Sequence, residues 1–118
     1  MKIEIPGVDT EKGMDLYDDD EDLYLIVLRS FATNTPGVLD KLRIVTKENL
    51  AEYAATIHGM KGTSTTIGAE TLRSAALKLE TFAKAGDFEG VIDGNEAFLN
   101  QATALVNDIK AWLDKNAE

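Results

Sequence analysis

The sequence predicts an all-α protein, an antiparallel up-down four-helix bundle with an additional short N-terminal helix. Over long segments apolar residues recur three and four positions apart, which places them on one face of a helix. No alternation of apolar and polar residues is long enough to indicate a strand. Short connections separate the helical segments, and these favour antiparallel neighbours. We expect one domain over residues 1–118, with residues 1–17 forming an N-terminal arm and the short helix.

Two helix starts are indicated near the N-terminus. Residues 1–8 are expected to form an extended arm across one end of the domain, and Asp9 can cap a short helix through Tyr17. The acidic run at residues 18–22 suits the start of a second helix, because the positive end of the helix dipole attracts negative charge. Apolar residues at helical spacing follow over residues 23–31. We interpret the acidic run as a solvated helix start.

The next segment contains an interruption. Asn-Thr-Pro-Gly at residues 34–37 breaks the pattern, which resumes over residues 38–44. Two helices or one kinked helix would both fit, because proline removes a backbone donor from a helix interior. Thr46 can cap the following helix, which carries an apolar face and should end near Ser64 or Thr65.

Two further helices complete the predicted bundle. Helical spacing covers residues 69–83, and Gly86 supplies a C-terminal stop before a tight turn. A sustained apolar stripe follows over residues 88–113. Gly90 and Gly94 interrupt it at a cost of about 1 kcal/mol each, so packing against the other helices must hold this segment.

Composition excludes several classes of function. Asp and Glu number 21 against 12 Lys and Arg, and the net charge of −9 repels nucleic acid and anionic membranes. The chain has no cysteine and one histidine, so we predict no metal site and no cofactor. It shows neither a signal peptide nor an apolar run that could cross a bilayer, and we predict a cytoplasmic location.

His58 is the candidate for chemistry. On the predicted helix it lies roughly 120° from the centre of the apolar face, so it should point outward or sideways. Small residues surround it on that surface. They are Ala51, Ala54, Ala55, Gly62 and Thr65. Gly59 and Gly62 together cost the helix about 2 kcal/mol relative to alanine, which is explained if a partner backbone approaches closely.

Lys61 adds a cation beside this histidine. Three residues apart on a helix, the two side chains can share a surface, and an ammonium there would stabilise negative oxygens carried by the imidazole. A neutral imidazole is a competent nucleophile, since its ordinary pKa of roughly 6.5 leaves much of it unprotonated. Lys61 precedes Gly62, the reverse of a nucleotide-binding loop, and no serine-type triad is evident. An incidental surface histidine remains the alternative.

The pattern His-x-x-Lys-Gly at residues 58–62, followed by Ile67-Gly68-Ala69 and Leu72, resembles the signature of histidine-containing phosphotransfer domains of two-component phosphorelays. A looser resemblance, which includes Leu79-Glu80 and Gly86-Asp87, extends over nearly the whole chain. It implies a four-helix bundle that carries a phosphoryl group without its own ATP or metal site. We therefore expect a phosphoryl carrier rather than an enzyme.

The resemblance also implies roles for individual residues. His58 would accept phosphate from one receiver-domain aspartate and pass it to another, and Lys61 would neutralise phosphate oxygens. Glu80, twenty-two positions after the histidine, would orient the imidazole, although an exposed surface glutamate is an equal alternative. The receiver would dock over small residues. These are Gly62, Ala54, Ala55 and Thr65.

The expected partner is the receiver domain of a response regulator or of a hybrid histidine kinase, which would bring Mg²⁺. We expect the protein itself to be a monomer. The alternative function is a helical adaptor that docks a receiver or kinase domain without accepting phosphate.

Overall fold

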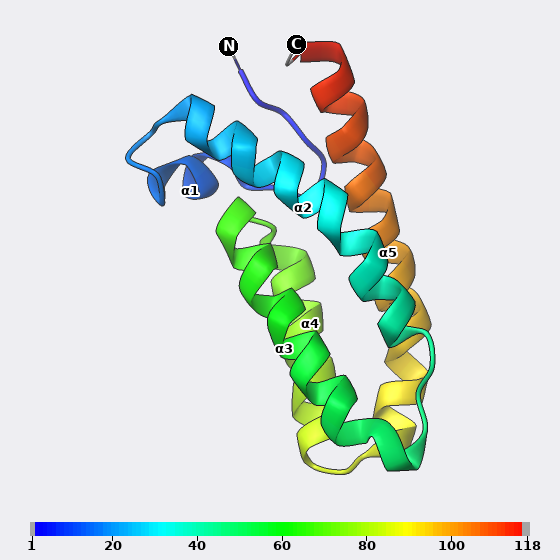
Figure 1. The fold of residues 1–118 in the computed structure, drawn as a ribbon. Coiled ribbons are helices and arrows are strands. Elements are labelled where there is room, and N and C mark those ends of the chain that lie inside the picture. Colours follow the sequence, from blue (N-terminus) through cyan, green and yellow to red (C-terminus); the bar gives the residue numbers. More distant parts are fainter. Residues whose placement is uncertain (1, 117–118) are drawn as a thin grey trace.

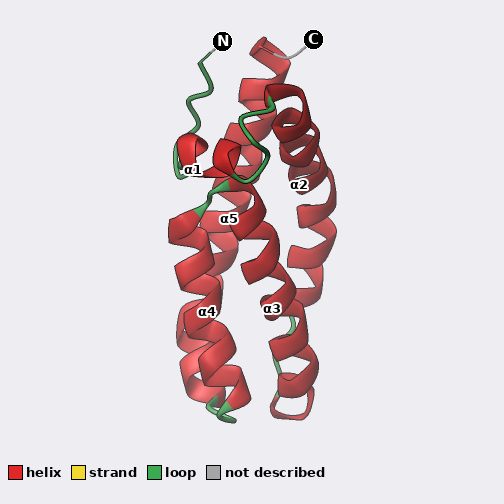
Figure 2. Ribbon diagram, turned by 90° about the vertical axis from the view of Figure 1, so that its left-hand side faces the viewer, coloured by secondary structure: helices red, strands yellow, loops and turns green. Residues whose placement is uncertain are grey.

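A computed structural model describes residues 2–116, and over these residues the chain forms helices and loops without any strand (Figures 1 and 2). The helices are α1 (Thr10–Asp15), α2 (Glu21–Leu42), α3 (Leu50–Ile67), α4 (Glu70–Lys84) and α5 (Phe88–Asn116), with a 3₁₀ turn η1 (Lys47–Asn49) before α3. The predicted all-α class is confirmed.

The four long helices pack along one another in an elongated body of 46 × 24 × 18 Å. α3 lies along α4, α5 lies along both α2 and α4, and α2 also contacts α3. The connections after α2 and after α4 lie at one end of the body, while the connection between α3 and α4 lies toward the other (Figure 1). The core is built from apolar side chains of all four helices. It includes Tyr24, Leu28, Ile57, Met60, Leu72, Phe98 and Ile109.

α2 resolves the alternative that the sequence left open, because one helix passes through Pro36. Proline cannot donate a backbone hydrogen bond to the carbonyl four residues earlier, which weakens a helix interior. Thr35 and Leu39 are 3% and 2% exposed, so buried side chains lie on both sides of the proline. Packing against the core thus carries the helix across this position.

Side-chain caps define several helix ends. The carboxylates of Asp9 and Asp20 accept hydrogen bonds of 3.1 Å from the backbone N–H groups of Lys12 and Leu23. α1 ends at Asp15, short of the predicted Tyr17. Thr46 caps η1 rather than α3 directly, in a reciprocal capping box with Asn49.

α3 is longer than predicted and ends at Ile67. Ser64 and Thr65 do not stop it, because their hydroxyls donate to carbonyls of the preceding turn, at 2.7 Å to Met60 and 3.0 Å to Lys61. Each polar side chain is therefore satisfied within the helix. Gly68, with φ of 79°, ends α3 in the left-handed conformation that glycine adopts most easily.

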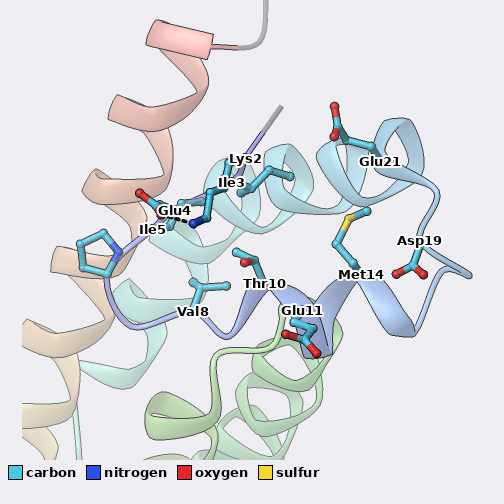
Figure 3. A pocket seen from close by; sticks show the side chains of 11 residues that line it. Lys2, Ile3, Glu4, Ile5, Val8, Thr10, Glu11, Met14, Asp19 and Glu21 are labelled. Carbon is cyan, nitrogen blue, oxygen red and sulfur yellow. Dashed lines mark ion pairs between the residues drawn. The ribbon is translucent and has the colours of Figure 1, made fainter.

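The N-terminal arm packs onto the bundle as expected. Ile3 and Ile5 are buried, and the arm, α1 and the start of α2 border an open surface hollow of about 810 Å³ (Figure 3). The backbone N–H of Asp9 donates to the carbonyl of Gly68 at 2.8 Å. The arm is thereby joined to the corner between α3 and α4.

Two tyrosines hold the same corner. Tyr24 on α2 donates its hydroxyl to the Ile67 carbonyl at 2.7 Å, and Tyr17 donates to the Thr66 carbonyl at 2.8 Å. These carbonyls lie at the C-terminus of α3, where no later turn supplies a backbone donor. The C-terminus of α3 is thus fixed by elements distant in sequence.

A buried polar contact fixes α3 near its beginning. Tyr53 donates to Asn95 Oδ1 at 2.6 Å, and Asn95 Nδ2 donates to the Leu42 carbonyl at 2.8 Å. This chain of bonds joins α3, α5 and the last residue of α2. His58 lies between the two fixed points of α3, so its position on the bundle is well determined.

Candidate functional site

α3 carries His58 on its outer side. The imidazole side chain is 61% exposed, while the nearby Ile57 and Met60 are 0% and 1% exposed and face the core. This is the orientation that the helical spacing predicts. The ring is accessible to another molecule while its helix is held by the core.

Glu80 on α4 contacts the imidazole. Its Oε2 lies 2.7 Å from His58 Nδ1, and its side chain is 3% exposed. The alternative of an exposed surface glutamate is therefore wrong. A buried carboxylate requires compensation by charge or hydrogen bonds.

Two lysines supply that compensation. Lys61 Nζ lies 2.8 Å from Glu80 Oε1, and Lys84 Nζ lies 2.9 Å from Oε2. Hydrogen bonds from Lys61 and Lys84 outweigh the opposing effect of burial, and with a smaller contribution from His58 they lower the pKa of Glu80 to about 2. The carboxylate is ionised at neutral pH.

An ionised carboxylate only accepts hydrogen bonds, so His58 Nδ1 must carry the hydrogen in this contact. In the neutral ring, the lone pair available to a partner then resides on Nε2. The arrangement selects one tautomer and points one nitrogen toward a potential electrophile.

Lys61 and Lys84 differ in their exposure. Lys61 and His58 both contact Glu80, so they lie on the same side of α3, as the sequence predicts. The Lys61 ammonium contacts the carboxylate, and its side chain is only 26% exposed. Lys84 is 64% exposed and was not predicted from the sequence. A signal was present, because Glu80 and Lys84 are four residues apart on one helix.

The predicted docking residues fall into two groups. Ala55, Gly62 and Thr65 are exposed, and apart from the adjoining residues and the helix backbone nothing lies within 4 Å of the position that a Cβ would take at Gly62. The expectation that Ala54 belongs to the exposed docking surface is wrong, since this residue is only 6% exposed. It lies three residues before Ile57 on the inward side of α3 and contributes only to the floor of the adjoining surface.

Two hollows adjoin α3, and His58 lines one of them. One, of about 620 Å³, is lined by Ala51, Ala54, Ala55, His58, Ala83, Lys84 and Gly86. The other, of about 360 Å³, lies between α2 and α3. Apolar side chains of Val27, Phe31, Val38 and Met60 contribute to it, together with Ala55 and Gly59 from the helix turns beside His58.

Among residues 2–116, no group of three or more His, Cys, Asp or Glu side chains is placed so that it could hold a metal ion. No helix in this part of the chain is both long and apolar enough to span a membrane.

The family model of the Hpt domain matches residues 26–115, a range that contains His58, Lys61 and Glu80. The chain belongs to the Hpt domain family. Hpt domains are phosphocarrier modules of two-component systems that work with receiver domains, and they have no catalytic site of their own. The matched range starts within α2, so the arm and α1 lie outside it. No match was found among curated proteins or among solved structures.

Proposed function

We propose that this Hpt domain relays a phosphoryl group between receiver-domain aspartates through a covalent intermediate on His58. The observation that carries the proposal is the exposed imidazole whose Nδ1 is bound to an ionised, buried Glu80. That contact leaves Nε2 as the nucleophilic nitrogen. A non-phosphorylated helical adaptor would need no such arrangement.

The transfer step balances without a base. The Nε2 lone pair attacks the phosphorus of the receiver's aspartyl phosphate, the Nε2–P bond forms, and the P–O bond breaks with its electrons leaving on the aspartate carboxylate. The hydrogen stays on Nδ1, so the ring becomes positively charged. Glu80 stabilises that charge through its 2.7 Å contact, and the reverse sequence delivers the phosphoryl group to a second receiver.

Lys61 is proposed to neutralise phosphate oxygens as they approach. Its ammonium lies beside the imidazole through their common partner Glu80, and a side-chain rotation would bring it to the phosphoryl group. The receiver would bring Mg²⁺ and most of the catalytic groups. The carrier then contributes only a nucleophile, its orientation and positive charge.

The receiver is proposed to dock across α2 and α3. Gly62, Ala55 and Thr65 provide a low surface beside His58, and the apolar groove between the two helices would accept side chains of the partner. We take the four long helices to act as one antiparallel bundle domain, monomeric and cytoplasmic, that presents this face.

The experiment is phosphotransfer from a radiolabelled receiver in the presence of Mg²⁺. Acid-labile, alkali-stable label should appear on the wild type and should be absent from His58→Gln. Glu52→Gln, at an exposed position of α3 outside the proposed docking surface, serves as a control for changes to the helix that keep the histidine. Label that persists in His58→Gln would refute the site. The adaptor alternative instead predicts receiver binding without label in the wild type, and binding that survives His58→Gln.

A further inference from the structure

The carboxylate of Glu80 has an uneven set of partners. Oε1 binds Lys61 alone, whereas Oε2 is shared by His58 Nδ1 at 2.7 Å and Lys84 Nζ at 2.9 Å. The Lys84 ammonium thus lies next to the imidazole in the resting protein. If Lys84 moved away, Glu80 would still keep one partner on each oxygen.

Lys84 also faces the same solvent space as the imidazole. The hollow beside His58 is lined by both of these side chains, and its remaining lining residues are alanines and Gly86. Lys61 does not line it. No bulky side chain in that lining would obstruct an ammonium that moves from Glu80 toward Nε2, and Lys84 is 64% exposed, so its motion costs little burial.

Phosphorylation would change the charge balance of this cluster. The resting cluster holds one carboxylate and two ammonium groups, and a phosphoryl group adds close to two negative charges on the exposed side. The ring itself becomes a cation next to Glu80, which makes the Lys84 charge on Oε2 less necessary. The more exposed ammonium is the one that can serve the new anion.

We propose that Lys84 is a second phosphoryl-binding residue, whose ammonium leaves Glu80 Oε2 and pairs with oxygens of the phosphoryl group on His58. This inference rests on the proposed function, since it requires His58 to carry phosphate. The two residues that share Oε2 then have different roles. The imidazole stays hydrogen-bonded to Glu80, whereas the Lys84 ammonium leaves Glu80 and binds the phosphoryl group.

The test uses the whole chain phosphorylated chemically with phosphoramidate, so that no receiver is needed. ³¹P NMR titration gives the pKa of the phosphoryl group. An ammonium paired with its oxygens favours the dianion, so Lys84→Ala should raise that pKa by roughly half a unit. Lys84→Arg should restore it. Lys78→Ala, which removes an exposed lysine from the same helix, should leave it unchanged.

Measuring Lys84→Ala in a Glu80→Gln protein distinguishes direct pairing of Lys84 with the phosphoryl group from a purely structural role of Lys84. If Lys84 acts only by holding Glu80, then Lys84→Ala should have no effect on the phosphoryl pKa once the carboxylate is gone. Direct pairing predicts that the effect persists there. An unchanged pKa in Lys84→Ala, or an effect lost in Glu80→Gln, would overturn the inference.

These outcomes are independent of the relay itself. Phosphorylation of the wild type by phosphoramidate without transfer to or from any receiver would contradict the proposed function and leave the Lys84 result standing. If phosphoramidate does not phosphorylate His58 in the wild type, both proposals are overturned, because an exposed Nε2 should react.

Discussion

Two pairs of glycines serve opposite purposes in this molecule. At Gly59 and Gly62, in the middle of α3, no atom beyond the adjoining residues and the backbone of the helix itself lies within 4 Å of the place where a Cβ would be. At Gly13 and Gly68 a Cβ would collide with its surroundings, with the Tyr24 ring and Ile67 carbonyl in the first case and with the Asp9 carbonyl in the second. One pair leaves space outside the protein, and the other allows close packing inside it.

The difference shows how α3 presents its histidine. The corner at Gly68 is held by packing and backbone hydrogen bonds, so the end of the helix is fixed. The middle, around His58, is bare on its outer side and is held from behind by the charged contacts of Glu80. Rigidity and access thus come from different stretches of the same helix.

The largest effect that would test this comparison is expected for Gly68→Ala. The left-handed φ of 79° and the collision with the Asp9 carbonyl should together lower the free energy of unfolding by about 3 kcal/mol. Urea unfolding followed by circular dichroism measures it. Gly86→Ala is the matched control, because Gly86 has a similar φ of 73° but open space around it, and it should cost only about 1 kcal/mol. Equal losses in both variants would show that packing at the corner is unimportant.

Acid should affect the charged side of α3 specifically. The pKa of Glu80 is lowered to about 2 in the folded protein, so its stabilising contribution is complete above the pKa of the unfolded chain. That contribution is lost as the pH falls from about 5 toward 2. Wild type should be more stable than Glu80→Gln at pH 7, and the difference should shrink over this range.

Urea unfolding at a series of pH values measures that difference. As a control, Glu52→Gln at an exposed position of α3 should show the same dependence of unfolding free energy on pH as the wild type. A gap between wild type and Glu80→Gln that stays constant down to pH 2 would contradict the account of Glu80.

Tyr24→Phe should have a smaller effect at the packed corner. It removes the hydroxyl that satisfies the Ile67 carbonyl and should lower stability by about 1–2 kcal/mol. Tyr17→Phe removes the equivalent bond to Thr66 at an exposed position, where water can replace it, and should cost less. Similar unfolding midpoints for the two variants would argue against the difference between a buried and a solvated contact.

The smallest effects, of opposite sign, are expected at the open pair. Gly59→Ala and Gly62→Ala should each stabilise the protein by up to about 1 kcal/mol, since alanine favours the helix and meets no neighbour. Gly62→Leu should keep the fold but slow transfer from the receiver, because it fills the docking surface. Rapid-quench transfer assays together with thermal unfolding would show both. A transfer rate in Gly62→Leu equal to that of the wild type would mean that the partner does not approach there.

The sequence predicted the elements that depend on local pattern. The recurrence of apolar residues three and four positions apart predicted the helices, and the same spacing predicted that His58 faces outward. The resemblance indicated Glu80, twenty-two positions after His58, as the residue that orients the imidazole, and in the structure its carboxylate contacts the ring. The roles of His58, Lys61 and Glu80 stay predictions until transfer is measured.

Features that depend on distant contacts could not be predicted in this way. The Tyr24 bond to Ile67 joins residues 43 positions apart, and the continuity of α2 through Pro36 depends on packing by other helices. Lys84 is a different case, since its spacing from Glu80 was visible in the sequence. What was missing was the knowledge that Glu80 is buried and needs a second cation.

The most direct test of the central claim is the identity of the nitrogen that carries phosphorus. Heteronuclear ³¹P–¹⁵N NMR of the phosphorylated, ¹⁵N-labelled protein should show phosphorus bonded to His58 Nε2, with Nδ1 still protonated toward Glu80. Phosphorus on Nδ1, or on any other residue, would contradict the account.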